Sequence, residues 1–186
     1  MASELYVETL KGLTSGANAN KVIIPSGQTL DASAGGFTTP AGHVIQVVQS
    51  TFGSEVDVSS STYVDSGLSG TITPTSTSSK ILILVTMASS GPYETSGAQS
   101  IGKYRLYDTT ASTEVYASTD RMYDYGGSGG FSMKNQVITT LYSPSTTSAT
   151  TIKLQMKLTN GDQFRINNDG SNTGGPTVMI LQEIAG

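Results

Sequence analysis

Apolar residues along the chain recur in short runs of the kind that form β-strands, and a helical spacing is nearly absent. Turns rich in Gly, Ser, Thr and Pro separate these runs. Many short strands at this spacing predict an all-β sandwich or barrel. We expect the strands near Val22–Ile24, Val44–Phe52, Gly67–Ile72, Ile81–Met87, Ile101–Tyr107, Glu114–Thr119, Phe131–Tyr142, Ile152–Leu158, Gln163–Ile166 and Thr177–Ile184.

Two of these strands are apolar on both faces. Successive residues of a strand point to opposite sides of the sheet, yet Ile81–Val85 and Val178–Leu181 are apolar at every position. A sandwich strand with one face in water alternates instead. The pattern therefore predicts an oligomer whose interface is itself a sheet face, and the alternative is a sheet covered by the N-terminal segment of the same chain. Without assigning a face to each, we expect the interface residues to be Ile81, Ile83, Val85, Val178, Ile180 and Leu181.

The segment 151–158 shows the alternation that the two apolar strands lack. Its apolar residues occupy every second position and its polar residues the positions between them. This predicts a strand with one face in the core and one in water. The inward residues would be Ile152, Leu154, Met156 and Leu158, and the outward ones Lys153, Gln155 and Lys157.

The chain also ends on an apolar run, from Thr177 to Gly186. Chain ends fray unless they are tied down, and a frayed end this apolar would be insoluble. The last residues are therefore predicted to lie within a sheet.

The first 42 residues differ from the rest, because extended pieces punctuated by Pro and Gly cannot bury a core of their own. We interpret 1–42 as an arm that attaches to a neighbouring chain or another protein, and 43–186 as the globular domain. The apolar residues expected to make that attachment are Leu5, Val7, Leu10, Val22, Ile23 and Ile24.

Composition narrows the classes of function. The chain has 186 residues, of which 13% are charged, with 26 Ser, 26 Thr and no Cys, so disulfide and thiolate chemistry are excluded. The net charge is −4 and no Lys/Arg cluster occurs, so no nucleic-acid partner is expected. The longest purely apolar run, Ile81–Val85, is far shorter than the ~20 residues that span a bilayer, and the N-terminus lacks a signal-peptide pattern. No membrane insertion is expected.

No catalytic, cofactor or metal residue is predicted. His43 is the single histidine; a Ser-His-Asp triad would need it, but no Gly-x-Ser-x-Gly motif precedes a helical pattern. Zinc would need more ligands than the chain supplies. The segments Asn160–Asp162 and Asn167–Gly170 offer oxygen ligands of the type calcium accepts, but these are also ordinary turn residues, and the turn interpretation is favoured.

Two loops are candidates for recognition of a receptor or glycan. Tyrosine combines an apolar face with a polar tip, which suits such surfaces, and acidic groups can accept hydrogen bonds from sugar hydroxyls. The alternative is that both segments are ordinary exposed loops, and a glycosidase pair of carboxylates is a more remote one. The candidate residues are Tyr93, Glu94, Asp120, Tyr123, Asp124 and Tyr125.

Four short motifs occur along the chain: a Ser-Lys-Ile-Leu strand, a Ser-Pro hairpin, a terminal Glu-Ile and a preceding arm. They lie in Pro74–Ile83, Tyr142–Ile152, Ile180–Gly186 and Ala17–Gly27. Together they resemble the motifs of small β-domains at the ends of tail fibres and other virion fibres of tailed bacteriophages. The resemblance implies a jelly-roll-like antiparallel β-sandwich with an extended N-terminal arm, usually trimeric, in a virion.

The resemblance leads to an expected function. The chain would be a non-enzymatic structural subunit of a phage virion, a short fibre or fibre tip, in which a homotrimeric knob attaches through its arm to other capsid or tail proteins and contacts a host-surface glycan. With only about 40 residues before the knob, a capsid decoration or cement protein is the alternative. A free carbohydrate-binding module is a second alternative.

Overall fold

The computed structural model describes residues 14–17, 19, 21–29, 39–94, 99–118, 122–125, 130–131, 134–167 and 175–186. It divides into two units, Met1–Thr38 and Thr39–Gly186. In the described part of the first unit, Gln28 N–H donates to Pro25 O across a turn at 3.1 Å. No strand forms at 22–24, where one was expected, and Val22, Ile23 and Ile24 are 44–53% exposed.

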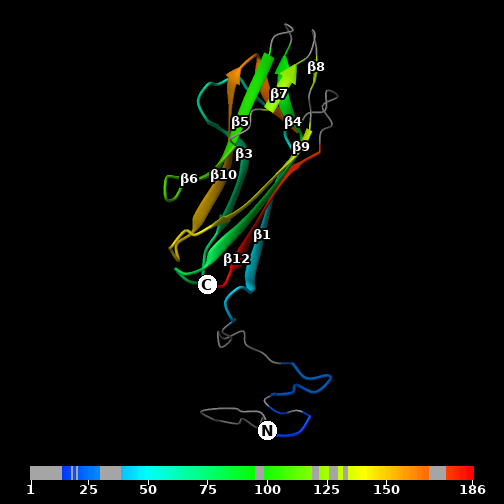
Figure 1. Cartoon of the computed structure of the whole chain (residues 1–186), viewed down its shortest axis with the longest axis vertical. Helices are drawn as coiled ribbons and strands as arrows, with labels where there is room; N and C mark the ends of the chain where they lie inside the picture. Colours follow the sequence, from blue (N-terminus) through cyan, green and yellow to red (C-terminus); the bar gives the residue numbers. More distant parts are fainter. Residues whose placement is uncertain are drawn as a thin grey trace. The chain divides into compact units, whose positions relative to one another are not determined.

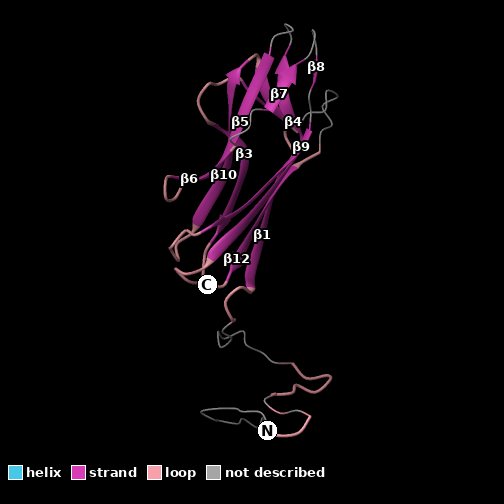
Figure 2. Cartoon of the chain, in the orientation of Figure 1, coloured by secondary structure: helices cyan, strands magenta, loops and turns pink. Residues whose placement is uncertain are grey.

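The second unit is built from strands, and no helix occurs among the residues described (Figure 2). Their bounds are β1 Val44–Phe52, β2 Val56–Val58, β3 Val64–Ile72, β4 Lys80–Glu94, β5 Gln99–Asp108, β6 Thr113–Ala117, β7 Met122–Tyr125, β8 Gly130–Phe131, β9 Lys134–Tyr142, β10 Thr150–Asn160, β11 Gln163–Ile166 and β12 Thr177–Ile184.

The strands form two antiparallel sheets (Figure 1). One has the order β1-β12-β4-β11-β2, with β8 and β9 also paired to β4, and the other has the order β3-β10-β5-β6, with β7 also paired to β5. The last strand thus lies between β1 and β4, and β10 lies between β3 and β5. Insertion of late strands between early ones is the connectivity of a jelly roll. The fold is an all-β, jelly-roll-like antiparallel sandwich, as predicted.

The core lies between the two sheets and is formed by side chains at alternate strand positions. In β10, Ile152, Leu154 and Met156 are fully buried and Leu158 is 6% exposed, which confirms the predicted alternation. The largest fully buried side chain is Phe164 of β11. It fills the space beside Gly102, where a Cβ atom would lie 2.6 Å from its ring.

Most predicted strands match the observed ones, and three agree residue for residue: Val44–Phe52, Gln163–Ile166 and Thr177–Ile184. The predicted strand Phe131–Tyr142 is divided between β8 and β9, and β2 was missed because it has only three residues. The C-terminus lies in a sheet, as expected: Gly42 N–H donates to Ala185 O at 2.7 Å, and Ala185 N–H donates to His43 O at 2.8 Å.

Two buried carboxylates tie loops to the strand ends. Glu183 of β12 accepts hydrogen bonds from Gln46 Nε2 at 2.6 Å and from Thr75 N and Oγ1, both at 2.7 Å. Asp108, at the end of β5, accepts a hydrogen bond from the hydroxyl of Tyr142 at 2.8 Å. Because Tyr142 ends β9, which belongs to the other sheet, this bond joins the two sheets. Both carboxylates are almost completely buried, and hydrogen bonds of this kind are what keeps a buried charge tolerable.

Candidate functional site

The most distinctive surface is the outer side of β1, β12, β4 and β9, where these four strands lie side by side. On it, apolar side chains point away from the core at alternate positions, and some are more than half exposed: Val47 56%, Val137 65% and Leu141 55%. We call this surface the apolar face. Its apolar residues are Val44 and Val47 on β1, Val178, Ile180 and Ile184 on β12, Leu82 and Leu84 on β4, and Val137 and Leu141 on β9.

The strand register arranges these residues in rows across the sheet. One row runs Val47, Gln182, Leu82, Leu141, the next runs Gln49, Ile180, Leu84, Thr139, and the third runs Thr51, Val178, Thr86, Val137. All of these side chains are uncharged. Lys80, at the start of β4, is a charged residue on the same side of the sheet, because it pairs in register with Ile184.

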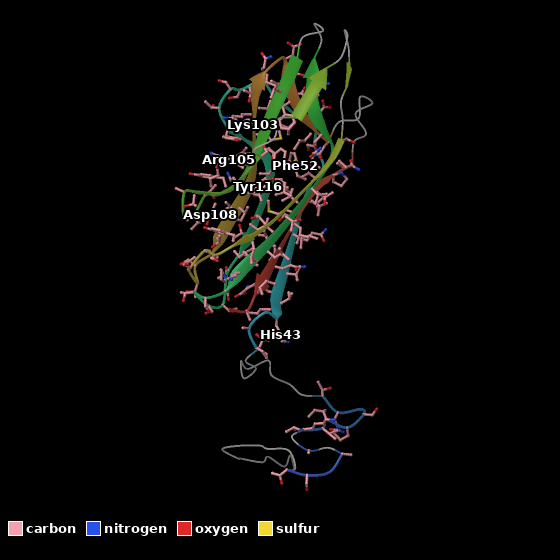
Figure 3. All side chains as sticks on the ribbon, in the orientation of Figure 1. His43, Phe52, Lys103, Arg105, Asp108 and Tyr116 are labelled. Carbon is pink, nitrogen blue, oxygen red and sulfur yellow. The ribbon has the colours of Figure 1, made fainter. Side chains whose placement is uncertain are left out.

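The outer side of the other sheet is the opposite in character. It carries the ion pairs Lys153–Asp65 and Arg105–Glu114. Figure 3 shows Lys103 and Arg105 on this sheet, with Asp108 at the end of the same strand. One sheet therefore has the charged outer surface of a strand in water. On the other sheet the ion pair Arg165–Asp57 lies on β11 and β2, whereas the rows across β1, β12, β4 and β9 are apolar or uncharged.

The predicted interface residues divide between the two sides of their sheet. Ile81, Ile83, Val85 and Leu181 are fully buried against the second sheet of the same chain. Such side chains are already covered and offer no surface to a second copy. Val178 and Ile180 point outward and are half-buried.

Leu82 and Leu84, which alternate with the buried residues of β4, belong to the apolar face but were not among the residues predicted for the interface. Val137 and Leu141 belong to a strand that had been predicted, but no interface role was assigned to it. Because every residue of Ile81–Val85 is apolar, the sequence indicates that both faces of this strand are covered. It does not indicate which side chains point into the core and which point outward. The register with β12 and β9 supplies that assignment.

His43 precedes β1 at the lower end of the sandwich in Figure 3. It is exposed, and its Nδ1 lies 3.0 Å from Pro40 O. His43 therefore lies at the entry to a strand.

Asn167 has a structural role in a turn. It has a φ of +58°, its amide donates to the carbonyls of Phe52 and Ser54, both at 2.9 Å, and its oxygen accepts from Thr177 Oγ1 at 2.7 Å. Its side-chain oxygen is therefore engaged within the protein. Residues 168–170 lie outside the described residues.

The candidate glycan residues are placed by backbone alone. Tyr93 and Glu94 end β4, and Tyr123, Asp124 and Tyr125 lie in β7, so both sets are on strands instead of the expected loops. Their side chains, and all of Asp120, lie outside the described residues. Of the arm residues, Leu5, Val7 and Leu10 also lie outside them.

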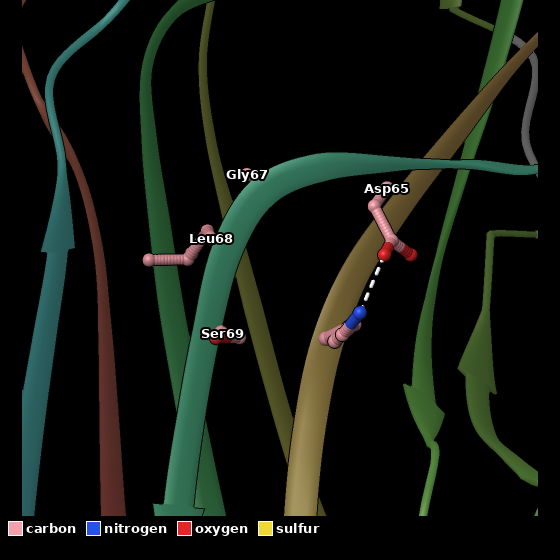
Figure 4. Close-up of a pocket in the computed structure, with 5 residues that line it drawn as sticks. Asp65, Gly67, Leu68 and Ser69 are labelled. Carbon is pink, nitrogen blue, oxygen red and sulfur yellow. Dashed lines mark hydrogen bonds and ion pairs between the residues drawn. The ribbon is translucent and has the colours of Figure 1, made fainter.

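A small depression lies on the charged side, where β3 bends (Figure 4). It has a volume of about 110 Å³ and is lined by Asp65, Gly67, Leu68, Ser69 and Lys153. The bend arises because Lys153 pairs with Ser69 while Gln155 pairs with Asp65, so three residues of β3 oppose one of β10. Gly67 has a φ of +93° there, and a Cβ atom on it would lie 2.4 Å from the ring of Phe52.

Within the described ranges, no three His, Cys, Asp or Glu side chains come together in a way that could hold a metal ion. No helix in that part of the chain is long and apolar enough to cross a membrane.

Comparison with known proteins gives a weak likeness in structure only. No protein-family model matches the chain, and no curated protein sequence is significantly similar to it. The viral particle of infectious bursal disease virus gives a TM-score of 0.39 at 14% identity, over 87% of this chain and 40% of that one. The VP2 subviral particle of the same virus gives 0.39 at 13% identity, over 76% and 38%. The chain thus spans about 40% of the length of these proteins. Likeness at this level does not define a fold, so the jelly-roll assignment rests on strand order and pairing.

Proposed function

We propose that this protein is a non-enzymatic structural subunit of a virion and that it assembles as a homotrimer through the apolar face. The observation that carries the proposal is that the three rows of this face carry no charge and that nothing among the described residues of Thr39–Gly186 covers them. A monomer in water rarely exposes a large contiguous apolar patch, and patches of this kind mark interaction surfaces. The phage-fibre motifs of the sequence supply the virion setting.

The size of the apolar face is of the right order for assembly. Four strands at ~4.8 Å spacing are ~19 Å wide, and seven residues at ~3.3 Å each are ~23 Å long, which gives a plane of about 440 Å². Burying about half of that as apolar area stabilises an assembly by roughly 5 kcal/mol per protomer at ~25 cal/mol per Å². A standard interface buries about 800 Å² per partner, so the edges of the sheet must also contribute.

The width of the face suits three copies around an axis. An equilateral triangle with sides of ~19 Å has its centre ~5.5 Å from each side, and packed sheets lie ~10 Å apart, or ~5 Å from their midplane. Three such faces turned towards a threefold axis would therefore meet at normal packing distance. In that arrangement β1 and β9, the two edges of the four-stranded region, come next to neighbouring protomers and supply the remaining contact.

A charge placed on the apolar face tests the assembly. Val137→Lys with Leu141→Lys puts two ammonium groups into the proposed seam, and burying unpaired charges is prohibitively costly. We expect the full-length double variant to remain folded and to have the mass of a monomer in light scattering. The control, Thr71→Lys, places a lysine on the exposed outer side of β3 and should leave the assembly unchanged. An unchanged mass for the double variant would refute the proposed interface.

Within the virion, a short fibre or fibre tip and a capsid decoration protein remain the two placements. Electron microscopy of particles labelled with an antibody against the knob separates them, because label on the tail supports the fibre and label over the head supports decoration. Particles without label at either place would refute the virion setting.

A further inference from the structure

The charged side of the sandwich gathers basic residues in an otherwise acidic protein. The outer surface of β10 and β5 carries Lys153, Lys157, Lys103 and Arg105, which are four of the ten Lys and Arg residues in the chain. Asp65 on β3 and Glu114 on β6 are the carboxylates paired to this group, so its balance is +2, whereas the whole chain has −4. This surface would therefore attract an anion, although the protein as a whole is acidic.

Two of these cations are directly opposed. Lys157 of β10 pairs in register with Lys103 of β5, and like charges opposite each other destabilise a sheet. Neither has a carboxylate partner among the described residues. The ammonium of Lys157 instead lies 4.5 Å from the centre of the Tyr63 ring. A bound anion would remove the repulsion that the fold leaves in place.

Aromatic rings are interleaved with the cations. The guanidinium of Arg105 lies 4.3 Å from the centre of the Tyr63 ring and 4.4 Å from that of Tyr107. Its Nε donates to Gln155 Oε1 at 2.8 Å, and its Nη1 is 3.2 Å from Glu114. The arginine and both rings are thus held in fixed positions, which lowers the entropy cost of binding a ligand.

We propose that this surface, formed by Tyr63, Lys103, Arg105, Tyr107 and Lys157, binds an acidic polysaccharide whose sugars carry carboxylate groups. The ammonium and guanidinium groups would pair with the carboxylates, and the tyrosine rings would contact the apolar faces of the sugars. The depression beside Lys153 adjoins the same strands and can receive a sugar substituent. This site lies on the sheet opposite the apolar face and does not depend on the assembly proposed above.

The carboxylates within the surface favour a sugar over a nucleic acid. Asp65 and Glu114 can accept hydrogen bonds from sugar hydroxyls, whereas they repel a backbone that carries a charge on every nucleotide. Each residue of a carboxylated polysaccharide carries hydroxyl groups beside its carboxylate, and these hydroxyl groups can donate to Asp65 and Glu114.

Calorimetric titration of the full-length protein with polygalacturonate tests the proposal. We expect binding that weakens as salt is raised and that falls at least tenfold in Lys103→Gln with Lys157→Gln. The control Lys80→Gln, on the other sheet, should bind like the original protein. Removing the opposed charges should leave the melting temperature of the double variant unchanged or raised, so a loss of binding would not reflect unfolding.

Four results would overturn the proposal. They are no binding of polygalacturonate, equal binding of neutral dextran, equal binding of oligodeoxythymidylate, and an affinity of the double variant equal to that of the original protein.

Discussion

Replacing Glu183 by Gln should destabilise the fold, although the two side chains have almost the same shape. Glu183 is fully buried and accepts from three donors. Gln46 Nε2 already uses its two hydrogens, one on Glu183 Oε2 at 2.6 Å and one on Thr73 O at 2.7 Å. An amide at position 183 would direct its own N–H at one of the donors. Rotating the Gln46 amide would relieve that clash, but its oxygen would then face the Thr73 carbonyl.

One buried polar contact is therefore lost whichever way the amides turn. An unsatisfied buried group costs about 1–3 kcal/mol, so we expect Glu183→Gln to lower the free energy of unfolding by about 2 kcal/mol at pH 7. For a chain of this size that corresponds to a fall of roughly 4–8 °C in melting temperature. Urea denaturation followed by circular dichroism measures it. The control Glu114→Gln removes a carboxylate that is 46% exposed and should change stability by less than about 0.5 kcal/mol.

The pH dependence of the stability difference between the original protein and Glu183→Gln provides a sharper test. Burial by itself raises the pKa of Glu183, but the hydrogen bonds from Gln46 and Thr75 outweigh it and hold the pKa below its ordinary value of 4.5. A carboxyl group whose folded-state pKa is lowered stabilises the fold above its unfolded pKa and loses that contribution as pH falls through the folded pKa. The difference between the original protein and Glu183→Gln should therefore shrink on acidification below about pH 4.5. Equal stability at pH 7, or a difference that grows on acidification, would refute the reasoning.

Three further predictions concern buried contacts. Tyr142→Phe leaves one oxygen of Asp108 without its donor and should cost about 1–3 kcal/mol in urea denaturation. Burial and the hydrogen bond to Asp108 raise the pKa of Tyr142 to about 12. The protonated hydroxyl therefore stabilises the fold below pH 10, and this stabilisation is lost as the pH rises towards 12. Ultraviolet titration should show one tyrosine that ionises at unusually high pH in the original protein and is absent from the variant. Gly102→Ala drives a methyl group into the ring of Phe164 and should cost about 1–3 kcal/mol, which thermal denaturation would show. Asn167→Ala removes two donors from buried contacts and should lower the melting temperature by several degrees, and an unchanged value would contradict its role in the turn.

The sequence predicted the strands well because alternation and turn residues are local signals. In β10 the lysines at alternate positions also identify the buried side, and Ile152 and Leu154 were placed correctly. In β4 every position of Ile81–Val85 is apolar, so only pairing with β12 and β9 decides which side chains enter the core.

The buried polar groups and the basic surface could not be predicted, because they depend on register between distant segments. Glu183 near a chain end gives no sign of burial, and its partner Thr75 is 108 residues away. Arg105 and Tyr63 come from different parts of the chain and meet only because β10 lies between β3 and β5.

The mass of the full-length protein in solution, measured by light scattering across a range of concentrations, tests the central claim most directly. One chain has a mass of 19.3 kDa, so a homotrimer closed through the apolar face should give three times that value, about 58 kDa. A mass of 19.3 kDa at every concentration would show that the apolar face does not join copies of this chain and would contradict the account.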